Sequence, residues 1–414
     1  MSIQSAFGFV FFVLIAWCFS ENKRQFPVRI VITGMIIQLA LGIVLLKFPF
    51  FTNAFVYLNR AVMALQESTG AGTSFVFGFI GGGDAPYDMK FPHNSFILAF
   101  QALPLVLVIS ALSAVLFYWG ILPKIVIGFS RVLEKTMKLG GAEGLGVSAN
   151  IFVGMVEAPL LIRPYVNRMT KSELFTLMTS GMATIAGTVM VLYASILEPV
   201  IENVIGHILT ASIISVPAAI VVSKIMVPET GNLTCGELTA ADSANSTMDA
   251  ITKGTTQGLE LLLNIIAMII VLVALVHLVN LFMALFPSFN GEPLTLQRIF
   301  GWVMSPVVWL MGVSWQEAHI AGSLMGTKTI LNEFIAYLDM RNLPAGTLSP
   351  RSMLIMSYAL CGFANPGSLG IMIGGLGSIA PDRRNDIVSL GVRSVIAGTI
   401  ATCMTGAVVG ILHG

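Results

Sequence analysis

Residues 142–168 read AEGLGVSANIFVGMVEAPLLIRPYVNR, an apolar stretch that glycine, proline and the carboxylate of Glu157 interrupt. A second interrupted apolar stretch, with Glu333, lies at residues 300–338. Non-helical backbone at membrane depth is tolerated only where it lines a cavity or is buried in protein. A matched pair of such segments indicates the binding site of a secondary transporter. We therefore expect two re-entrant helical hairpins around one ligand site.

The composition of the whole chain fits insertion into a membrane. Of the 414 residues, 56% are hydrophobic and 10% are charged, whereas a soluble domain carries about 25% charged residues. This excludes a water-soluble globular protein, and the net charge of +1 without a basic stripe argues against nucleic-acid binding. The apolar runs have the length of helices and not of β-barrel strands. We expect an all-α polytopic membrane protein.

Eight apolar segments are long enough to be transmembrane helices. They lie at residues 4–20, 30–48, 95–120, 172–196, 200–226, 258–287, 352–380 and 387–412. No basic region precedes the first segment, so we do not expect a cleaved signal peptide. Residues 51–66 predict an amphipathic interfacial helix, and residues 227–257 contain a polar linker between two halves of the chain.

The distribution of lysine and arginine predicts the orientation. If both hairpins re-enter on the side where they start, 15 of the 22 basic residues are cytoplasmic, 6 are outside, and Lys328 lies in the second hairpin. The positive-inside rule then places both termini outside and the linker in the cytoplasm. Counting the hairpins as full spans would separate Arg163, Arg168 and Lys171 from the basic residues at 124–138, which the rule disfavours.

The two halves of the chain follow the same order. In the first half, Glu157 precedes a span that is interrupted at residues 184–188, TIAGT. In the second half, Glu333 precedes a span that is interrupted at residues 365–368, NPGS. Because short, interrupted apolar segments in corresponding positions are typical of transporters built from repeats, this order predicts inverted repeats.

Glu157 and Glu333 are carboxylates inside otherwise apolar stretches. An intramembrane carboxylate is costly unless it is paired or hydrated, so each indicates a functional site. The alternative is a structural carboxylate that holds its hairpin together. Glu317 lies near the predicted turn of the second hairpin and could serve either purpose. Three other carboxylates lie near span ends and are expected to be solvated: Glu198, Glu202 and Glu260.

Both helix breaks carry groups that suit a ligand. At residues 365–368, proline and glycine free backbone groups, while Asn365 and Ser368 can form hydrogen bonds with hydroxyl groups. A kink that serves only helix packing is the alternative. Residues 184–188 can present carbonyl groups to a cation, and Asn150 can add a side-chain oxygen. Composition alone does not choose between Na⁺ and H⁺.

The motifs of other chemistries are absent from the sequence. There is no GxxxxGK[ST] phosphate loop, so an ATP-driven pump is not expected, and no HExxH motif of a metalloprotease occurs. The four cysteines have neither metal-site nor disulfide spacing. We therefore expect a transporter without covalent chemistry or a cofactor, and not an enzyme.

Read together, these segments resemble the concentrative nucleoside transporter family. Residues 150–164, NIFVGMVEAPLLIRP, resemble the first hairpin motif of the family. The other matching segments are Asn332-Glu333-Phe334, CGFANPGSLG at 361–370, Gly374-Gly-Leu376, Ala380-Pro381 and TSFVFG at 73–78. The resemblance covers essentially the whole chain. The long polar tail and extra spans of the animal members are missing, so the chain resembles the bacterial members.

The resemblance implies a homotrimer in the cytoplasmic (inner) membrane, which takes up nucleosides with a coupling cation, usually Na⁺. By residue match, the cation would be surrounded by Asn150, Val153, Thr184 and Ile185. The ribose hydroxyls would meet Glu333, Asn365 and Ser368. The base would pack against Phe363, and Glu157 would reach the base.

The resemblance also implies that each subunit combines a scaffold with a transport region that moves as an elevator. The scaffold would comprise residues 1–120 and the span at 258–287. The transport region would comprise a first repeat at 121–226 and a second at 288–414, with the cytoplasmic linker at 227–257.

The tip of the first hairpin departs from the commonest family pattern. Many members have Gly-Gln-Thr-Glu there, whereas this chain has Gly154-Met155-Val156-Glu157. Replacing an amide and a hydroxyl group with thioether and methyl groups removes hydrogen bonds to a pyrimidine edge, and methionine offers a pliable apolar surface to a larger ring. Together with Thr188-Val189, the Gly154-Met155 pair resembles the purine-preferring animal subtype. We expect a preference for purine nucleosides.

Na⁺-coupled nucleoside symport is therefore the leading hypothesis. An H⁺-coupled or broadly selective nucleoside symporter is the nearest alternative, because intramembrane carboxylates also carry protons. A passive channel would use similar hairpins but would not accumulate substrate. A membrane enzyme could use the paired carboxylates on a lipid-soluble substrate.

Overall fold

The computed structural model describes residues 2–88, 96–236, 244–288 and 293–413, and the regular structure of these residues is helical throughout. In the first half the helices are α1 Ser2–Cys18, α2 Val28–Lys47, α3 Pro49–Phe77, α4 Leu98–Gln101, α5 Leu105–Tyr118, α6 Ile121–Met137, α7 Gly141–Ala149, α8 Glu157–Leu160, α9 Arg163–Val166, α10 Lys171–Ala183, α11 Gly187–Leu197 and α12 Val204–Met226. In the second half they are α13 Thr247–Met283, α14 Leu296–Met311, α15 Trp315–Ile330, α16 Glu333–Arg341, α17 Pro350–Ala359, α18 Pro366–Ile379 and α19 Arg384–Leu412. The predicted all-α class is confirmed.

Six helical segments of the described residues are long and apolar enough to cross a membrane. They are residues 28–47, 98–118, 171–197, 204–226, 247–283 and 381–412. The other two predicted spans are represented by shorter helices: α1 has 17 residues, and the span predicted at 352–380 is divided into α17 and α18. The second division follows from Pro366, whose ring cannot occupy the interior of a continuous helix without disrupting it.

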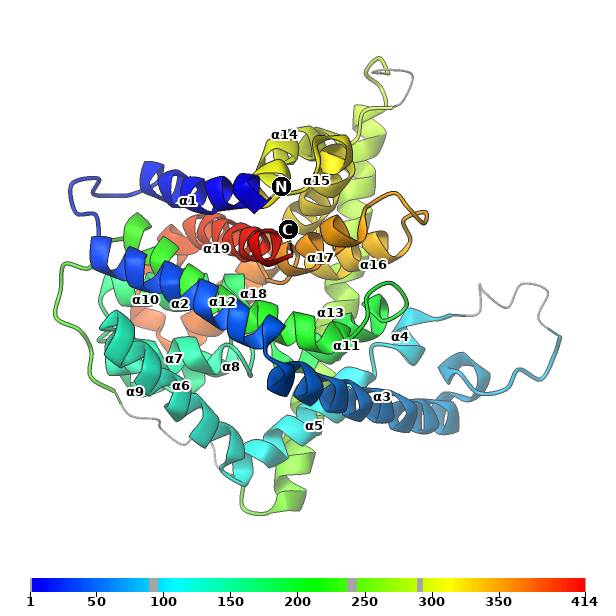
Figure 1. The fold of residues 1–414 in the computed structure, drawn as a ribbon. Helices are drawn as coiled ribbons and strands as arrows, with labels where there is room; N and C mark the ends of the chain where they lie inside the picture. Colours follow the sequence, from blue (N-terminus) through cyan, green and yellow to red (C-terminus); the bar gives the residue numbers. More distant parts are fainter. Residues whose placement is uncertain (1, 89–95, 237–243, 289–292, 414) are drawn as a thin grey trace.

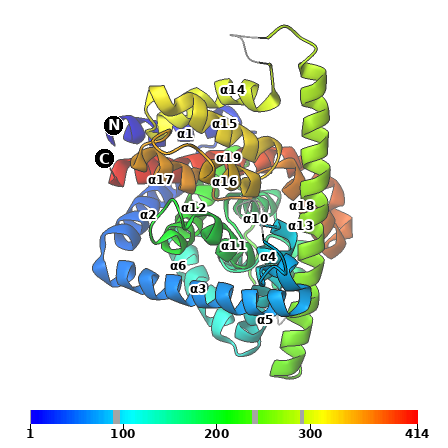
Figure 2. The same ribbon diagram turned by 90° about the vertical axis from the view of Figure 1, so that its right-hand side faces the viewer.

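The interior of the molecule is formed by α12, α10–α11 and α19, and α13 lies at its periphery. In the apolar windows of α12 and α13, 89% and 11% of the residues are buried, respectively. Figure 2 shows α13 as a long straight helix along one side of the molecule. It packs on α5 through Gly254 and Gly258, where an added Cβ would lie within 3 Å of α5 atoms. Small residues permit such close approach of membrane helices.

The two chain ends lie close together, near α1 and α19 (Figure 1). Helices α1 and α19 pack against each other, and α19 also contacts α10, α12 and α17. The C-terminal helix therefore joins elements from both halves of the chain.

The second hairpin differs from the predicted interval of 300–338. Helices α14 and α15 meet at an angle of 117°, and Gly312, with φ of 110°, ends α14 in a conformation that favours glycine. The hairpin itself consists of α15 and α16, residues 315–341, with its tip at Leu331 and Asn332. The sequence prediction merged α14 with the hairpin because both are apolar.

Two other predicted boundaries also shift. Helix α13 begins at Thr247, within the predicted linker of 227–257, because Ser246 caps it by accepting a hydrogen bond from Asp249 N at 3.1 Å. The predicted interfacial helix at 51–66 is part of the longer α3, which ends at Gly78 with φ of 60°. In both places, polar residues continue a helix that the apolar pattern alone does not reveal.

A buried charge network holds the first hairpin against α12 and the linker. Lys224 Nζ lies 2.8 Å from Glu143 Oε1 in the first turn of α7 and 3.3 Å from Glu229 Oε2 in the linker. Glu143 is fully buried and Lys224 is 2% exposed. Burying either charge alone would be costly, so the network fixes the base of the hairpin relative to α12.

Candidate functional site

One cavity collects the predicted substrate residues between the two hairpin tips, the two helix breaks and α13. All ten residues predicted to bind the substrate line it: Gly154, Met155, Val156, Glu157, Thr188, Val189, Glu333, Phe363, Asn365 and Ser368. These residues come from four segments that are far apart in the sequence. The fold brings together both hairpin tips and both breaks, as the pairing of the two halves predicted.

Glu333 is the buried carboxylate at the wall of this cavity. It is the first residue of α16, which Asn332 caps by accepting a hydrogen bond from Ile335 N at 2.9 Å. Tyr193 Oη donates to Glu333 Oε1 at 2.6 Å, and Asn365 Nδ2 donates to Oε2 at 2.9 Å. Because a carboxylate has about four acceptor positions, both oxygens keep capacity for further donors. The arrangement suits a ligand with two adjacent hydroxyl groups.

Asn365 also builds the second break. Its Oδ1 accepts a hydrogen bond from Ser368 N at 2.8 Å, so it caps α18, whose first residue is Pro366. Proline is well accommodated at this position because the first N–H groups of a helix have no partner within the helix. The amide thus bridges the Glu333 carboxylate and the start of α18, and it holds Ser368 at the cavity wall.

The first hairpin tip presents Glu157 to the cavity. Its side chain is exposed and lines the cavity, and it lies so close to Gly154 that a Cβ there would overlap the carboxylate. Met155 is 9% exposed and packs beside Gly181, and Val156 packs beside Gly375 of α18. The two side chains that replace the common Gln-Thr pair therefore form an apolar wall of the cavity and also join the tip to α10 and α18.

Two of the four predicted cation residues, Asn150 and Thr184, are in contact at the base of this tip. Thr184 Oγ1 lies 2.9 Å from Ser180 O and 3.3 Å from Asn150 O, and Asn150 Nδ2 donates to Leu177 O at 3.4 Å. Asn150 Oδ1 is buried without a hydrogen-bond partner among the described residues. An orphaned buried acceptor costs about 1–3 kcal/mol, and a cation would compensate it. Of the other two predicted residues, Val153 belongs to the first hairpin tip and Ile185 directly follows Thr184 in the first break.

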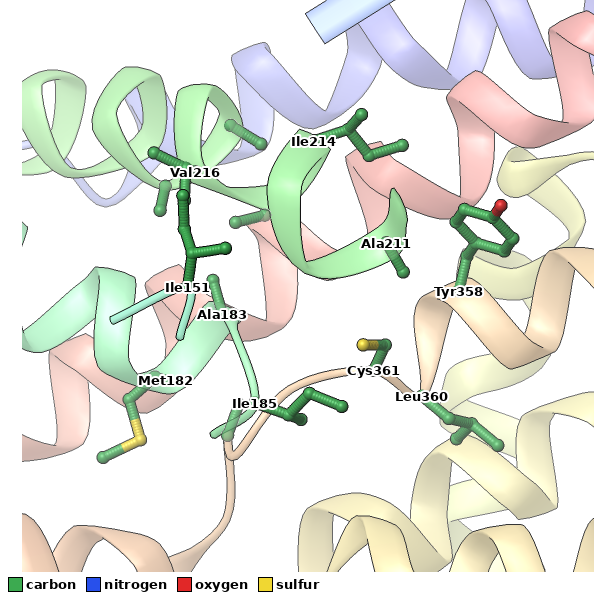
Figure 3. Packing of buried hydrophobic residues seen from close by; sticks show 14 of the residues in the cluster. Ile151, Met182, Ala183, Ile185, Ala211, Ile214, Val216, Tyr358, Leu360 and Cys361 are labelled. Carbon is green, nitrogen blue, oxygen red and sulfur yellow. The ribbon is translucent and has the colours of Figure 1, made fainter. Parts of the chain in front are cut away.

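The hairpin tip and the two breaks are in direct contact. Gly187 N donates to Phe152 O at 3.1 Å, which joins the first break to the first tip. In the structure the second break comprises residues 360–365, between α17 and α18, and an added Cβ on its Gly362 would lie 2.9 Å from Met182 O and 2.8 Å from Thr402 Cγ2. Figure 3 shows Ile185 of the first break near Cys361, which lies two residues after the end of α17, below α12. A movement of one break therefore affects the other.

The sequence reasoning missed Tyr193 and the contribution of α13. Tyr193 lies on α11 one turn after the first break, and a tyrosine in an apolar helix indicates a buried hydroxyl that needs a partner. Asn264 of α13 lines the cavity beside five apolar residues of the same helix. This lone amide among LLLNIIAMII was the available indication.

The three carboxylates that were expected to be solvated, Glu198, Glu202 and Glu260, are exposed on the surface of the chain. Glu317, which was left open, lies at the start of α15, at the opposite end of that helix from the tip. It accepts hydrogen bonds from Ser349 N and Ser352 Oγ, both at 2.6 Å, and so joins the start of α15 to the start of α17.

Three protein-family descriptions match the chain. They are the N-terminus of Na⁺-dependent nucleoside transporters at residues 7–80, a nucleoside recognition "Gate" at 99–200, and the C-terminus of Na⁺-dependent nucleoside transporters at 207–410. The three matches together extend over most of the sequence.

Curated relatives match the chain over nearly its full length. The uncharacterized transporter YutK of Bacillus subtilis is 37% identical over 98% of this chain and 98% of its own. The nucleoside permease NupC of Helicobacter pylori is 32% identical over 100% of this chain and 98% of its own. Human solute carrier family 28 member 3 is 36% identical over 98% of this chain, but over only 59% of its own length.

Solved structures share the fold. CNTnw in an inward-facing substrate-bound state has a TM-score of 0.90 at 33% identity and covers 100% of this chain and 99% of its own. A variant of CNTnw in an outward-facing state has a TM-score of 0.91 at 32% identity, with 100% and 98% coverage. This polytopic membrane protein therefore belongs to the concentrative, Na⁺-dependent nucleoside transporter family, and it is a transporter and not an enzyme.

Proposed function

We propose that this chain imports nucleosides by symport with Na⁺, and that the cavity between the hairpin tips is the nucleoside site. The observation that carries the proposal is that the first hairpin tip belongs to both predicted sites. Residues 150–153 carry the candidate cation groups, and residues 154–157 line the cavity. A cation that orders this short segment also orders the wall of the substrate site.

The coupling runs through contacts of the tip. A cation held by Asn150 and Thr184 would draw the end of α7 toward the first break, where Gly187 N already donates to Phe152 O at 3.1 Å. Gly154 and Glu157 follow directly in sequence. Ligands that order the same segment bind cooperatively, and the effect is reciprocal. The nucleoside should therefore raise the affinity for Na⁺ as much as Na⁺ raises the affinity for the nucleoside.

Within the cavity, Glu333, Asn365 and Ser368 would receive the ribose. The Glu333 carboxylate can accept hydrogen bonds from two hydroxyl groups, while Tyr193 and Asn365 fix its orientation. Phe363 offers a ring face to the base, and Glu157 can accept a hydrogen bond from an exocyclic amine.

The base preference proposed here is for purines. Met155, Val156 and Val189 make the wall near Thr188 largely apolar, and the available apolar surface suits the larger ring system. Competition assays test this: adenosine, guanosine and inosine should each displace labelled adenosine far better than uridine or cytidine. Equal competition by uridine would refute the preference and indicate a broadly selective symporter.

Transport would follow an elevator mechanism in a homotrimer of the cytoplasmic membrane, with both termini outside. The element order supports two inverted repeats, because α5, α6, hairpin α7–α9, broken helix α10–α11 and α12 correspond to α13, α14, hairpin α15–α16, broken helix α17–α18 and α19. With this correspondence the chain has eight spans. The proposed scaffold, residues 1–120 and 258–287, includes the greater part of the apolar, mostly exposed α13.

Equilibrium binding to the purified protein tests the symport proposal. Labelled adenosine should bind tightly in NaCl and weakly in choline chloride at the same ionic strength. Asn150→Ala should remove this difference while leaving weak binding. Adenosine affinity that is equal in both salts, but changes with pH, would refute Na⁺ coupling and support H⁺ coupling.

A further inference from the structure

Lys328 is a buried cation that the proposed transport mechanism does not use. It lies in the last turn of α15, and its side chain is 0% exposed. Its Nζ donates to Ala359 O at 2.8 Å and to Thr402 Oγ1 at 3.0 Å. Both partners are neutral, and Lys328 takes part in none of the ion pairs found among the described residues.

The other fully buried lysine provides a contrast. Lys224 is 2% exposed and has two carboxylates within 3.3 Å, Glu143 and Glu229. Paired burial of this kind is the usual way to compensate a buried ammonium group. Lys328 instead donates its hydrogen bonds to a carbonyl oxygen and a hydroxyl oxygen. Oxygen atoms of these two kinds also coordinate hard metal cations such as Na⁺.

The location of Lys328 corresponds to that of the predicted Na⁺ residues in the other half. In the first half, Asn150 is the C-cap of the first hairpin helix α7, and Thr184 is the C-cap of α10, which precedes the break. In the second half, Lys328 lies in the last turn of the hairpin helix α15, and Ala359 is the last residue of α17, which precedes the break.

We propose that the Lys328 ammonium group is a fixed cation. In the second half of the chain it occupies the position that corresponds to the proposed Na⁺ site at Asn150 and Thr184 in the first half. It is a positioning residue, which joins the end of α15 to the end of α17 and to α19. This interpretation rests on the proposed Na⁺ symport function. It predicts that the chain needs a mobile cation only at the first hairpin.

The charge has two local roles. The ammonium group lies at the C-terminal end of α17, where the helix dipole favours a positive charge. It also fixes the end of α15 directly before Asn332 and Glu333, and the end of α17 shortly before Phe363 and Asn365. Thr402, its second ligand, lies against Gly362 of the second break. Through these contacts Lys328 holds both polypeptide segments that bring ribose-binding groups to the cavity.

Replacing the fixed cation tests the proposal. Lys328→Ala would leave a space lined by Ala359 O and Thr402 Oγ1, into which a second Na⁺ can enter. In proteoliposomes, adenosine uptake by this variant at low Na⁺ should fall by about tenfold or more, which corresponds to the loss of a single charged contact. High Na⁺ should restore it, and the Hill coefficient for Na⁺ should rise from about 1 to about 2. The charge moved per nucleoside, obtained from reversal potentials, should double.

Matched variants separate charge from packing. Lys328→Arg keeps the charge and should retain uptake, whereas Lys328→Met fills the space without charge and should lose uptake at every Na⁺ concentration. Adding Thr402→Val to Lys328→Ala removes a ligand for the second ion and should abolish recovery by Na⁺. These readouts would not change in this pattern if Lys328 only filled space.

Each result supports or overturns the proposal. Wild-type uptake that ignores Na⁺ would reject the symport function itself. Na⁺-dependent wild type together with a Lys328→Ala variant that keeps a Hill coefficient of about 1 would overturn the fixed-cation role alone. If Lys328→Ala does not fold, Lys328→Met decides: uptake and Na⁺ dependence like those of the wild type would overturn the proposal, and loss of uptake that Lys328→Arg preserves would support it.

Discussion

Glu333→Gln is the substitution that probes the ribose site most sharply. In the wild type, Tyr193 Oη and Asn365 Nδ2 both donate to the carboxylate, at 2.6 and 2.9 Å, so both of its oxygens act as acceptors. The glutamine amide has one acceptor oxygen and one donor NH₂ group. Its NH₂ group must therefore face either a donor of the protein or the hydroxyl groups of the ligand.

The size of the effect follows from the lost hydrogen bonds. A hydrogen bond to a charged group contributes about 1.5–3 kcal/mol. Two ribose hydroxyls bound to the carboxylate would together contribute about 3–6 kcal/mol if both bonds are lost, and each 1.4 kcal/mol corresponds to about a factor of ten in affinity. We therefore expect adenosine affinity to fall by about 10²–10⁴-fold.

A double-mutant cycle between protein and ligand isolates this contact. Binding of adenosine and of 2′,3′-dideoxyadenosine is measured in Na⁺ for the wild type and for Glu333→Gln. Removing the hydroxyls should weaken binding strongly in the wild type and little in the variant. Glu198→Gln, an exposed carboxylate outside the cavity, is the matched control and should behave like the wild type. An equal dideoxy penalty in the wild type and in Glu333→Gln would refute the assignment of the ribose to Glu333.

Three other substitutions test the parts that support the site. Lys224→Met leaves Glu143 as an uncompensated buried charge, which costs about 3–5 kcal/mol. The melting temperature of this variant in detergent should therefore fall well below that of Lys253→Met, because the exposed ion pair between Lys253 and Asp249 contributes about 1 kcal/mol or less. Equal melting temperatures of the two variants would contradict the stabilising role of the buried network. Gly187→Ala places a Cβ against Phe152 O and should raise the Na⁺ concentration for half-maximal uptake by about tenfold, since overpacking costs about 1–3 kcal/mol. Gly370→Ala is the control, because a Cβ there meets no other part of the chain within 4 Å beyond its own helix, and it should leave the Na⁺ dependence unchanged. Unchanged Na⁺ dependence in Gly187→Ala would contradict the proposed coupling through the tip. Asn150→Ala removes the orphaned Oδ1 and should abolish the thermal stabilisation by Na⁺. Persistent Na⁺ stabilisation would exclude Asn150 as a ligand.

The parts of the fold that the sequence predicted are those with a strong local cause. Charge scarcity and apolar length predicted a helical membrane protein, and the glycine and proline positions predicted both breaks. The ten residues predicted for the substrate line one cavity. Four of them, Glu157, Glu333, Asn365 and Ser368, could be predicted from the residues themselves, because isolated carboxylates and helix breakers in apolar segments have few purely structural explanations. The other six were expected only from the resemblance to the transporter family.

The parts that the sequence did not predict depend on tertiary packing. The bend at Gly312 separates α14 from the second hairpin, yet the residues on either side of it have the same apolar character. Tyr193 reaches Glu333 from a helix 140 residues earlier in the chain, and Asn264 faces the cavity from α13. A side chain's partner across such distances follows from the packing of whole helices and not from local sequence.

The most direct test of Na⁺-coupled nucleoside symport is adenosine accumulation in proteoliposomes under a Na⁺ gradient and, separately, under a pH gradient. We expect an inward Na⁺ gradient to drive adenosine above its external concentration, and dissipating that gradient to release the excess. A pH gradient alone should produce no accumulation. Accumulation that follows only the pH gradient, or equilibration without accumulation under either gradient, would contradict this function.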